Sequence, residues 1–130
     1  MKQFNYLKGQ VGEKAAEEFL RKKGYQILER NFQTKFGEID IIAKEKRKGA
    51  TLPKTVFVEV KTKSGEEFGE PWEMVDERKI GRVRRMAELY LMKKRLGEVA
   101  CRIDVVGVWL DIEGEVEKIA SIKIINSLGK

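Results

Sequence analysis

The sequence contains no histidine and only one cysteine, Cys101. Without histidine there is no Ser-His-Asp or Cys-His nucleophile, no histidine general base and no zinc site of the HExxH type. A single cysteine excludes an intramolecular disulfide and a CxxC metal knuckle, and it fits a reducing compartment. Catalysis in this chain would therefore depend on carboxylates, lysines, hydroxyls and a hard metal ion.

Long apolar runs are also missing. The longest span a few residues, whereas a membrane helix needs roughly 20, and the opening MKQFNYLKGQ lacks the apolar core of a signal peptide. We therefore expect a cytoplasmic protein with no membrane partner. The 130 residues are 42% hydrophobic and 37% charged, which is enough to bury a core, and we expect residues 1–130 to form a single domain.

Hydrophobic periodicity predicts two helices. Residues 8–23 carry apolar side chains at helical spacing and are followed by Gly24 as a stop signal. Asp76 is a credible N-cap for a second helix that runs to about residue 96. The expected buried stripes are Val11, Ala15, Ala16, Phe19 and Leu20 in the first helix, and Ile80, Val83, Ala87, Tyr90 and Leu91 in the second.

Five segments read as strands: 25–31, 38–44, 55–62, 102–110 and 116–125. They are rich in β-branched residues and are bounded by glycine, proline or polar turn residues. The predicted order is α-β-β-β-α-β-β. This order indicates an α/β fold in which a central mixed β-sheet is flanked by helices.

Positive charge gathers between residues 77 and 102. Nine basic and three acidic residues lie there, so this stretch accounts for the whole net charge of +6. Most charge runs are solvated helix faces, but an excess confined to one element favours a surface for nucleic-acid phosphates. The residues expected to bind nucleic acid are Lys79, Arg82 and Arg85, and an acidic protein partner is an alternative.

The residues that point to chemistry are Asp40, Glu59 and Lys61. Glu59 and Lys61 share one strand face, and a hairpin would bring Asp40 beside Glu59. Two adjacent carboxylates repel each other and are relieved by a divalent cation, for which Mg²⁺ or Mn²⁺ suits an oxygen-only site. The alternative is a cross-strand carboxylate–lysine pair on a half-exposed sheet.

The first helix offers a third carboxylate. On a helical wheel that takes Val11 as its origin, Glu13 lies at the rim of the buried face and Glu17 lies farther toward solvent. Glu13 is therefore the better candidate to lean over the sheet. An ordinary acid in the first half of a helix is the alternative interpretation for both.

Five short motifs stand out: Gly12-Glu13, Gly24-Tyr25, Arg30-Asn31, Gly37-Glu38-Ile39-Asp40-Ile41-Ile42-Ala43 and Val56-Phe57-Val58-Glu59-Val60-Lys61. Over most of the chain they resemble the small bacterial YraN-type proteins, which are similar in fold to restriction endonucleases. More distantly, the pattern resembles archaeal Holliday junction resolvases of the PD-(D/E)XK nuclease superfamily. The proline that usually precedes the metal-binding aspartate is replaced here by Ile39.

The resemblance implies a restriction endonuclease-like fold and a divalent-metal-dependent nuclease. Glu13, Asp40, Glu59 and Lys61 would be its catalytic residues, with Asp40 and Glu59 holding Mg²⁺ or Mn²⁺. DNA, including branched DNA, is the expected substrate ahead of RNA, and a homodimer is implied because resolvases cut two symmetrical strands. A non-catalytic nucleic-acid-binding module and a protein-interaction domain remain as alternatives.

Overall fold

A computed structural model of the chain describes residues 2–45, 53–65, 73, 75–96 and 100–125, with side chains from residue 7 onward. Its elements are α1 (Lys2–Lys22), β1 (Tyr25–Thr34), β2 (Gly37–Glu45), β3 (Lys54–Lys63), α2 (Glu77–Lys93), β4 (Cys101–Leu110) and β5 (Val116–Ile125). The predicted order α-β-β-β-α-β-β is confirmed. This α/β arrangement is consistent with a restriction endonuclease-like fold.

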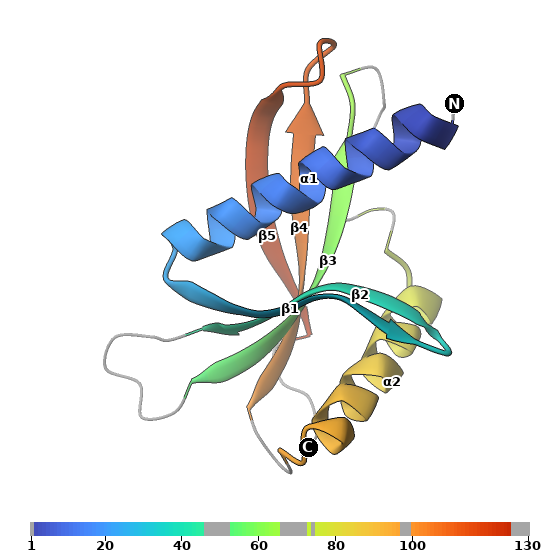
Figure 1. Ribbon diagram of the computed structural model, residues 1–130, viewed down its shortest axis with the longest axis vertical. Coiled ribbons are helices and arrows are strands. Elements are labelled where there is room, and N and C mark those ends of the chain that lie inside the picture. The colour runs from blue at the N-terminus through green and yellow to red at the C-terminus, as the bar shows by residue number, and fades with distance from the viewer. Residues whose placement is uncertain (1, 46–52, 66–72, 74, 97–99, 126–130) are drawn as a thin grey trace.

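The five strands form one twisted sheet in the order β1-β2-β3-β4-β5 (Figure 1). Neighbouring strands are antiparallel except for β3 and β4, which are parallel. A parallel pair needs a long crossover connection, and the segment that contains α2 provides it. The sheet is therefore mixed, as predicted.

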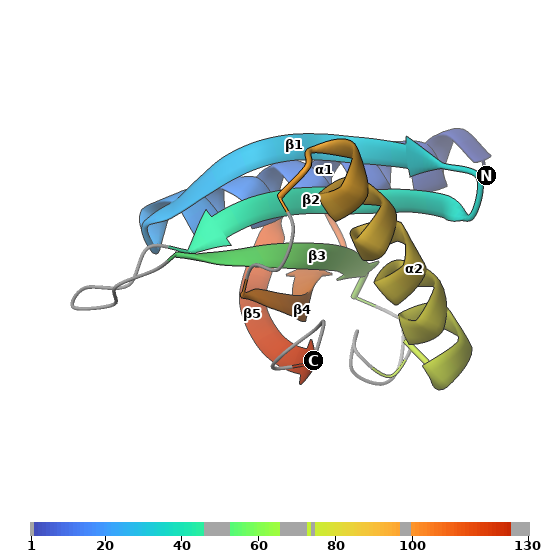
Figure 2. The same ribbon diagram turned by 90° about the horizontal axis from the view of Figure 1, so that it is seen from below.

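Each face of the sheet has its own hydrophobic cluster because side chains alternate along β3. Val56 and Val58 pack with Ala16 and Leu20 of α1, whereas Phe57 packs on the other face with α2. Helix α1 crosses β3, β4 and β5 (Figure 1), and α2 lies beside β1, β2 and β3 (Figure 2). The α2 cluster also buries the Cys101 thiol, as expected of a small core residue.

Three boundaries differ from the predictions by three residues or more. Helix α1 already begins at Lys2 rather than at residue 8, and β1 continues to Thr34 rather than ending at residue 31. Helix α2 ends at Lys93 rather than at about residue 96. Pairing with β2 carries β1 onward through Phe32, Gln33 and Thr34, of which only Phe32 is buried. Backbone hydrogen bonds to β2 therefore lengthen β1 beyond the end that hydrophobic periodicity predicts.

Val11 was wrongly assigned to the buried stripe of α1. Its side chain is 40% exposed, and the neighbouring Gly12 faces the sheet instead. A Cβ atom on Gly12 would overlap Oγ1 of Thr62 in β3. Glycine therefore permits the close approach of α1 to β3, and this approach brings the following residue, Glu13, to the sheet.

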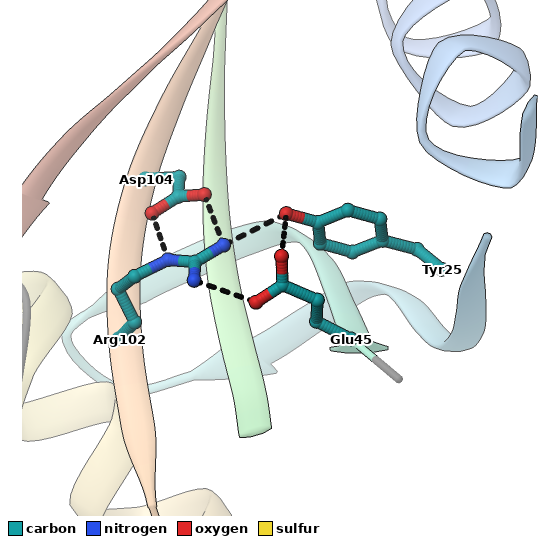
Figure 3. A network of polar contacts seen from close by, with 4 residues as sticks. All are labelled: Tyr25, Glu45, Arg102 and Asp104. Atoms are coloured by element: carbon teal, nitrogen blue, oxygen red, sulfur yellow. Dashed lines mark hydrogen bonds and ion pairs between the residues drawn. The ribbon is translucent and has the colours of Figure 1, made fainter. Parts of the chain in front are cut away.

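Arg102 joins three strands through a buried polar network (Figure 3). Its Nε and Nη2 atoms donate to the two oxygens of Asp104 at 2.7 and 2.9 Å. Nη1 donates to Glu45 at 2.7 Å, and Nη2 also donates to the Tyr25 hydroxyl at 2.8 Å. Burial alone would lower the pKa of Arg102, but these acceptors outweigh it and raise the pKa above its ordinary value. Arg102 is 1% exposed, so it does not contribute to a basic surface as the charge count had suggested.

None of the helices in the described part of the chain has the length and apolar character needed to cross a bilayer. The sequence predicts loops at 45–54 and 63–75, which are rich in glycine, proline and polar residues, and within them residues 46–52, 66–72 (with Trp72) and 74 lie outside the described residues. Gly97, the expected stop after the second helix, also lies outside them.

Replacing Gly12 with alanine should destabilise the protein by about 1–3 kcal/mol, because the added methyl group overlaps Thr62 in a packed contact. Gly9→Ala is the matched control, since a Cβ there meets no atom within 4 Å. The control should leave stability unchanged or raise it by up to about 1 kcal/mol. Urea unfolding of the two variants measures the difference, and equal free energies of unfolding would contradict the close contact.

Candidate active site

The candidate site lies where β2 and β3 stop pairing. Their ladder runs from Glu45 opposite Lys54 to Ile41 opposite Val58 and ends there. Two residues beyond Val58, the Val60 backbone N–H donates to Oδ2 of Asp40 at 2.7 Å. The Asp40 side chain, rather than the β2 backbone, thus accepts the hydrogen bond from the Val60 N–H of β3.

The alternation of β2 is broken at the same residue. Ile39 packs in the α2 cluster and Ile41 packs in the α1 cluster, although a regular strand would place both on one face. Opposite this position in β1, Asn31 has a φ of 53°, in the left-handed region. Asp40 therefore lies at the point where β2 changes which hydrophobic cluster its side chains enter.

Burial is the main reason why the pKa of Asp40 is raised from 3.8 to about 7. The neighbouring Glu59 carboxylate raises it further, while the Val60 N–H lowers it. Glu13 raises the pKa and Lys61 lowers it, each by a smaller amount. Glu13, Glu59 and Lys61, the other three residues expected to be catalytic, therefore all affect the pKa of Asp40.

Glu59 is buried, with a side chain that is 6% exposed. Its Oε2 atom lies 3.1 Å from Nζ of Lys79 and 3.5 Å from Nζ of Lys61. Its Oε1 atom is buried and has no hydrogen-bond partner among the described residues. Native structures rarely leave a buried carboxylate oxygen unpaired, so this atom is the strongest local indication of a site that accepts a further ligand.

Glu13 reaches the site from α1. Its Oε1 accepts a hydrogen bond from Nδ2 of Asn31 at 3.1 Å. Glu17, the other candidate, forms ion pairs with Arg21 and Arg30 at 2.8 and 3.1 Å. Glu13 is therefore close enough to raise the pKa of Asp40, whereas Glu17 is paired with two arginines.

Asp40 and Glu59 can supply oxygen ligands to a hard cation. Within the described ranges, no group of three or more histidine, cysteine or acidic side chains could hold a metal ion. Two carboxylates nevertheless fit Mg²⁺, which commonly binds one or two protein carboxylates and completes its shell with water and substrate phosphate. The unpaired Oε1 of Glu59 is the atom that fits this role best.

The three residues expected to bind nucleic acid differ in their surroundings. Arg82 and Arg85 are exposed on α2, and the Arg85 guanidinium lies over the Phe36 ring at 5.6 Å. Lys79 turns instead toward Glu59. Sequence reasoning missed this contact, and it assigned no role to Asn31 although the Arg30-Asn31 motif contains that residue. The Asp76 cap was a usable signal for Lys79, because it fixes the first turn of α2.

Comparison with known proteins identifies the family. Residues 12–108 match the model of the uncharacterised protein family UPF0102. A UPF0102 protein of Moorella thermoacetica is 46% identical over 118 residues, which is 91% of each chain. One from Caldicellulosiruptor saccharolyticus is 44% identical over 115 residues, 88% of this chain and 92% of the relative. The chain belongs to the UPF0102 family, as its resemblance to YraN-type proteins had indicated.

Asp40→Asn should change how stability depends on pH. The folded protein holds a proton on Asp40 up to about pH 7, whereas the unfolded chain loses it near pH 4. Without divalent cations, the wild type should therefore lose up to about 4 kcal/mol relative to the variant as pH rises from 4 to 8, at about 1.4 kcal/mol per pKa unit.

The measurement is urea unfolding in EDTA across that pH range. Asparagine keeps an oxygen that can accept the Val60 N–H, so the comparison isolates the charge. Parallel stability curves for the two proteins would contradict the raised pKa.

Proposed function

We propose that this protein is a divalent-metal-dependent nuclease that hydrolyses phosphodiester bonds in DNA, including branched repair or recombination intermediates. The observation that carries the proposal is the half-buried Asp40 beside the buried Glu59, whose Oε1 atom has no partner among the described residues. Mutual repulsion makes such a pair costly for stability alone, and a cation would relieve it. Sites that sacrifice stability in this way are commonly functional.

Asp40 and Glu59 would hold Mg²⁺ or Mn²⁺. Such an ion supplies Lewis-acid stabilisation of the negative charge that develops on the phosphate and promotes ionisation of the attacking water. Lys61 lies on the same strand face as Glu59, so its ammonium would orient the nucleophile or the phosphate. Glu13, held by Asn31, adds a third acid that favours a cation at Asp40.

The basic face of α2 supports nucleic acid as the substrate. Arg82 and Arg85 are exposed on the helix whose first turn reaches Glu59. Phosphates that contact this face would run past the acid pair. Non-catalytic nucleic-acid binding is the second candidate function, because the Lys79–Glu59 ion pair neutralises a carboxylate without a metal.

Cleavage of labelled four-way junction, flap, single-stranded and linear duplex DNA tests the proposal directly. The wild type should cut at least one substrate with Mg²⁺ or Mn²⁺ and none in EDTA. Glu59→Gln and Asp40→Asn should lower the rate by about 100-fold or more, because each removes a charged ligand of the cation.

Both variants are purified identically to the wild type, so that a contaminating nuclease would give equal rates in all three proteins. No cutting by the wild type, with DNA binding that persists in EDTA, would favour the binding module.

If the four-way junction is the preferred substrate, the proposal extends to a two-fold homodimer. A monomer at high concentration in equilibrium sedimentation would then contradict the junction-resolving version.

Arg82→Ala and Arg85→Ala should each flatten the salt dependence of DNA binding by about one unit in the log–log slope, as expected for one lost phosphate contact. Arg84→Ala is the matched control. Arg84 is exposed on the same helix but lies roughly 200° around it from Arg82. Fluorescence anisotropy at several salt concentrations gives the slopes, and equal slopes for all three variants would remove this face from the interface.

A further inference from the structure

Two lysines from different elements share one carboxylate oxygen at the candidate site. Lys61 follows Glu59 by two residues on β3, so strand geometry places it nearby. Lys79 comes from α2, yet its Nζ atom is the closer of the two to Oε2 of Glu59, at 3.1 Å against 3.5 Å. Sequence proximity explains Lys61 but not Lys79.

The backbone of Lys79 is fixed at the start of α2. Oδ1 of Asp76 accepts a hydrogen bond from the Lys79 N–H at 2.9 Å, and the Asp76 carbonyl accepts one from Ile80. Val83, one turn farther on, is buried against the sheet and anchors the helix. The Lys79 side chain remains 29% exposed, so its ammonium can move while its backbone stays in place.

Lys79 and a divalent cation would compete for the same group. A cation held by Asp40 and Glu59 would lie within a few ångströms of the Lys79 ammonium, and like charges at that distance repel strongly in a partly buried site. The unpaired Oε1 of Glu59 offers the cation a ligand, but Oε2 is occupied by lysine. Binding of the cation would therefore weaken the Lys79–Glu59 ion pair.

We propose that Lys79 is a positioning residue that neutralises Glu59 in the cation-free protein and is released when a divalent cation binds, which makes its ammonium available to a nucleic-acid phosphate. The inference rests on the proposed function because it assumes a cation at Asp40 and Glu59. It adds regulation to that site. Because coupling between ligands is reciprocal, nucleic acid that engages Lys79 would also strengthen cation binding.

Mn²⁺ titration followed by electron paramagnetic resonance measures the competition without relying on activity. Lys79→Met should bind Mn²⁺ about tenfold more tightly than the wild type, because a unit positive charge leaves the site. Lys79→Arg restores the charge and should return the affinity toward the wild-type value. Arg84→Met, which removes an exposed charge of α2 outside the proposed nucleic-acid-binding face, should bind Mn²⁺ as the wild type does.

Release of the ammonium has its own readout in the wild type. Limited acetylation followed by peptide mass spectrometry should modify Lys79 several-fold faster in Mg²⁺ than in EDTA. Lys118 on β5, which is exposed and lies over the Trp109 ring, serves as the reference and should react equally in both. A Lys79 rate that ignores Mg²⁺, or an unchanged Mn²⁺ affinity in Lys79→Met, would overturn the inference.

Failure of this inference is distinguishable from failure of the proposed function. Wild-type protein that binds no Mn²⁺ would overturn both. Mn²⁺ binding that is lost in Asp40→Asn but unchanged in Lys79→Met would overturn only the role of Lys79 and leave the metal site standing.

Discussion

The hydrogen bond from the Val60 N–H to the Asp40 carboxylate is the contact on which the candidate site depends. It occupies the position where the β2–β3 ladder ends, so the two strands stay connected there through a side chain. The same bond holds the half-buried Asp40 carboxyl group beside Glu59, although desolvation and repulsion both raise the pKa of Asp40. This one hydrogen bond thus connects β2 to β3 and also keeps Asp40 beside a second carboxylate.

Comparison of the two buried acidic clusters explains why only one of them is a candidate site. In the Arg102 network, all three guanidinium nitrogens donate hydrogen bonds, and Asp104 is held through both of its oxygens. A fully satisfied network of this kind rigidifies the fold. At the other end of β3, Glu59 keeps one buried oxygen without a partner. The difference between the clusters lies in hydrogen-bond satisfaction, since both contain buried carboxylates and a basic group.

Much of the fold was predictable because its local signals agree. Alternating valines in β3, the Asp76 cap of α2 and the glycines that bound the strands specified the order of elements, and the structure confirmed it. Strand periodicity also placed Glu59 and Lys61 together. Residues 2–7 of α1 and the end of β1 were missed because helix continuation and backbone pairing carry these elements beyond the predicted bounds.

By itself the sequence determined the element order, the mixed α/β class, the family and the absence of histidine and disulfide chemistry. These follow from composition, periodicity and motifs, all of which are local. Only the tertiary structure decided that Gly12 rather than Val11 faces the sheet, that Arg102 is buried and that Lys79 reaches Glu59. Those outcomes depend on how closely α1 approaches β3 and where α2 crosses the sheet. Such distances arise from packing between elements far apart in the chain, which no local pattern encodes.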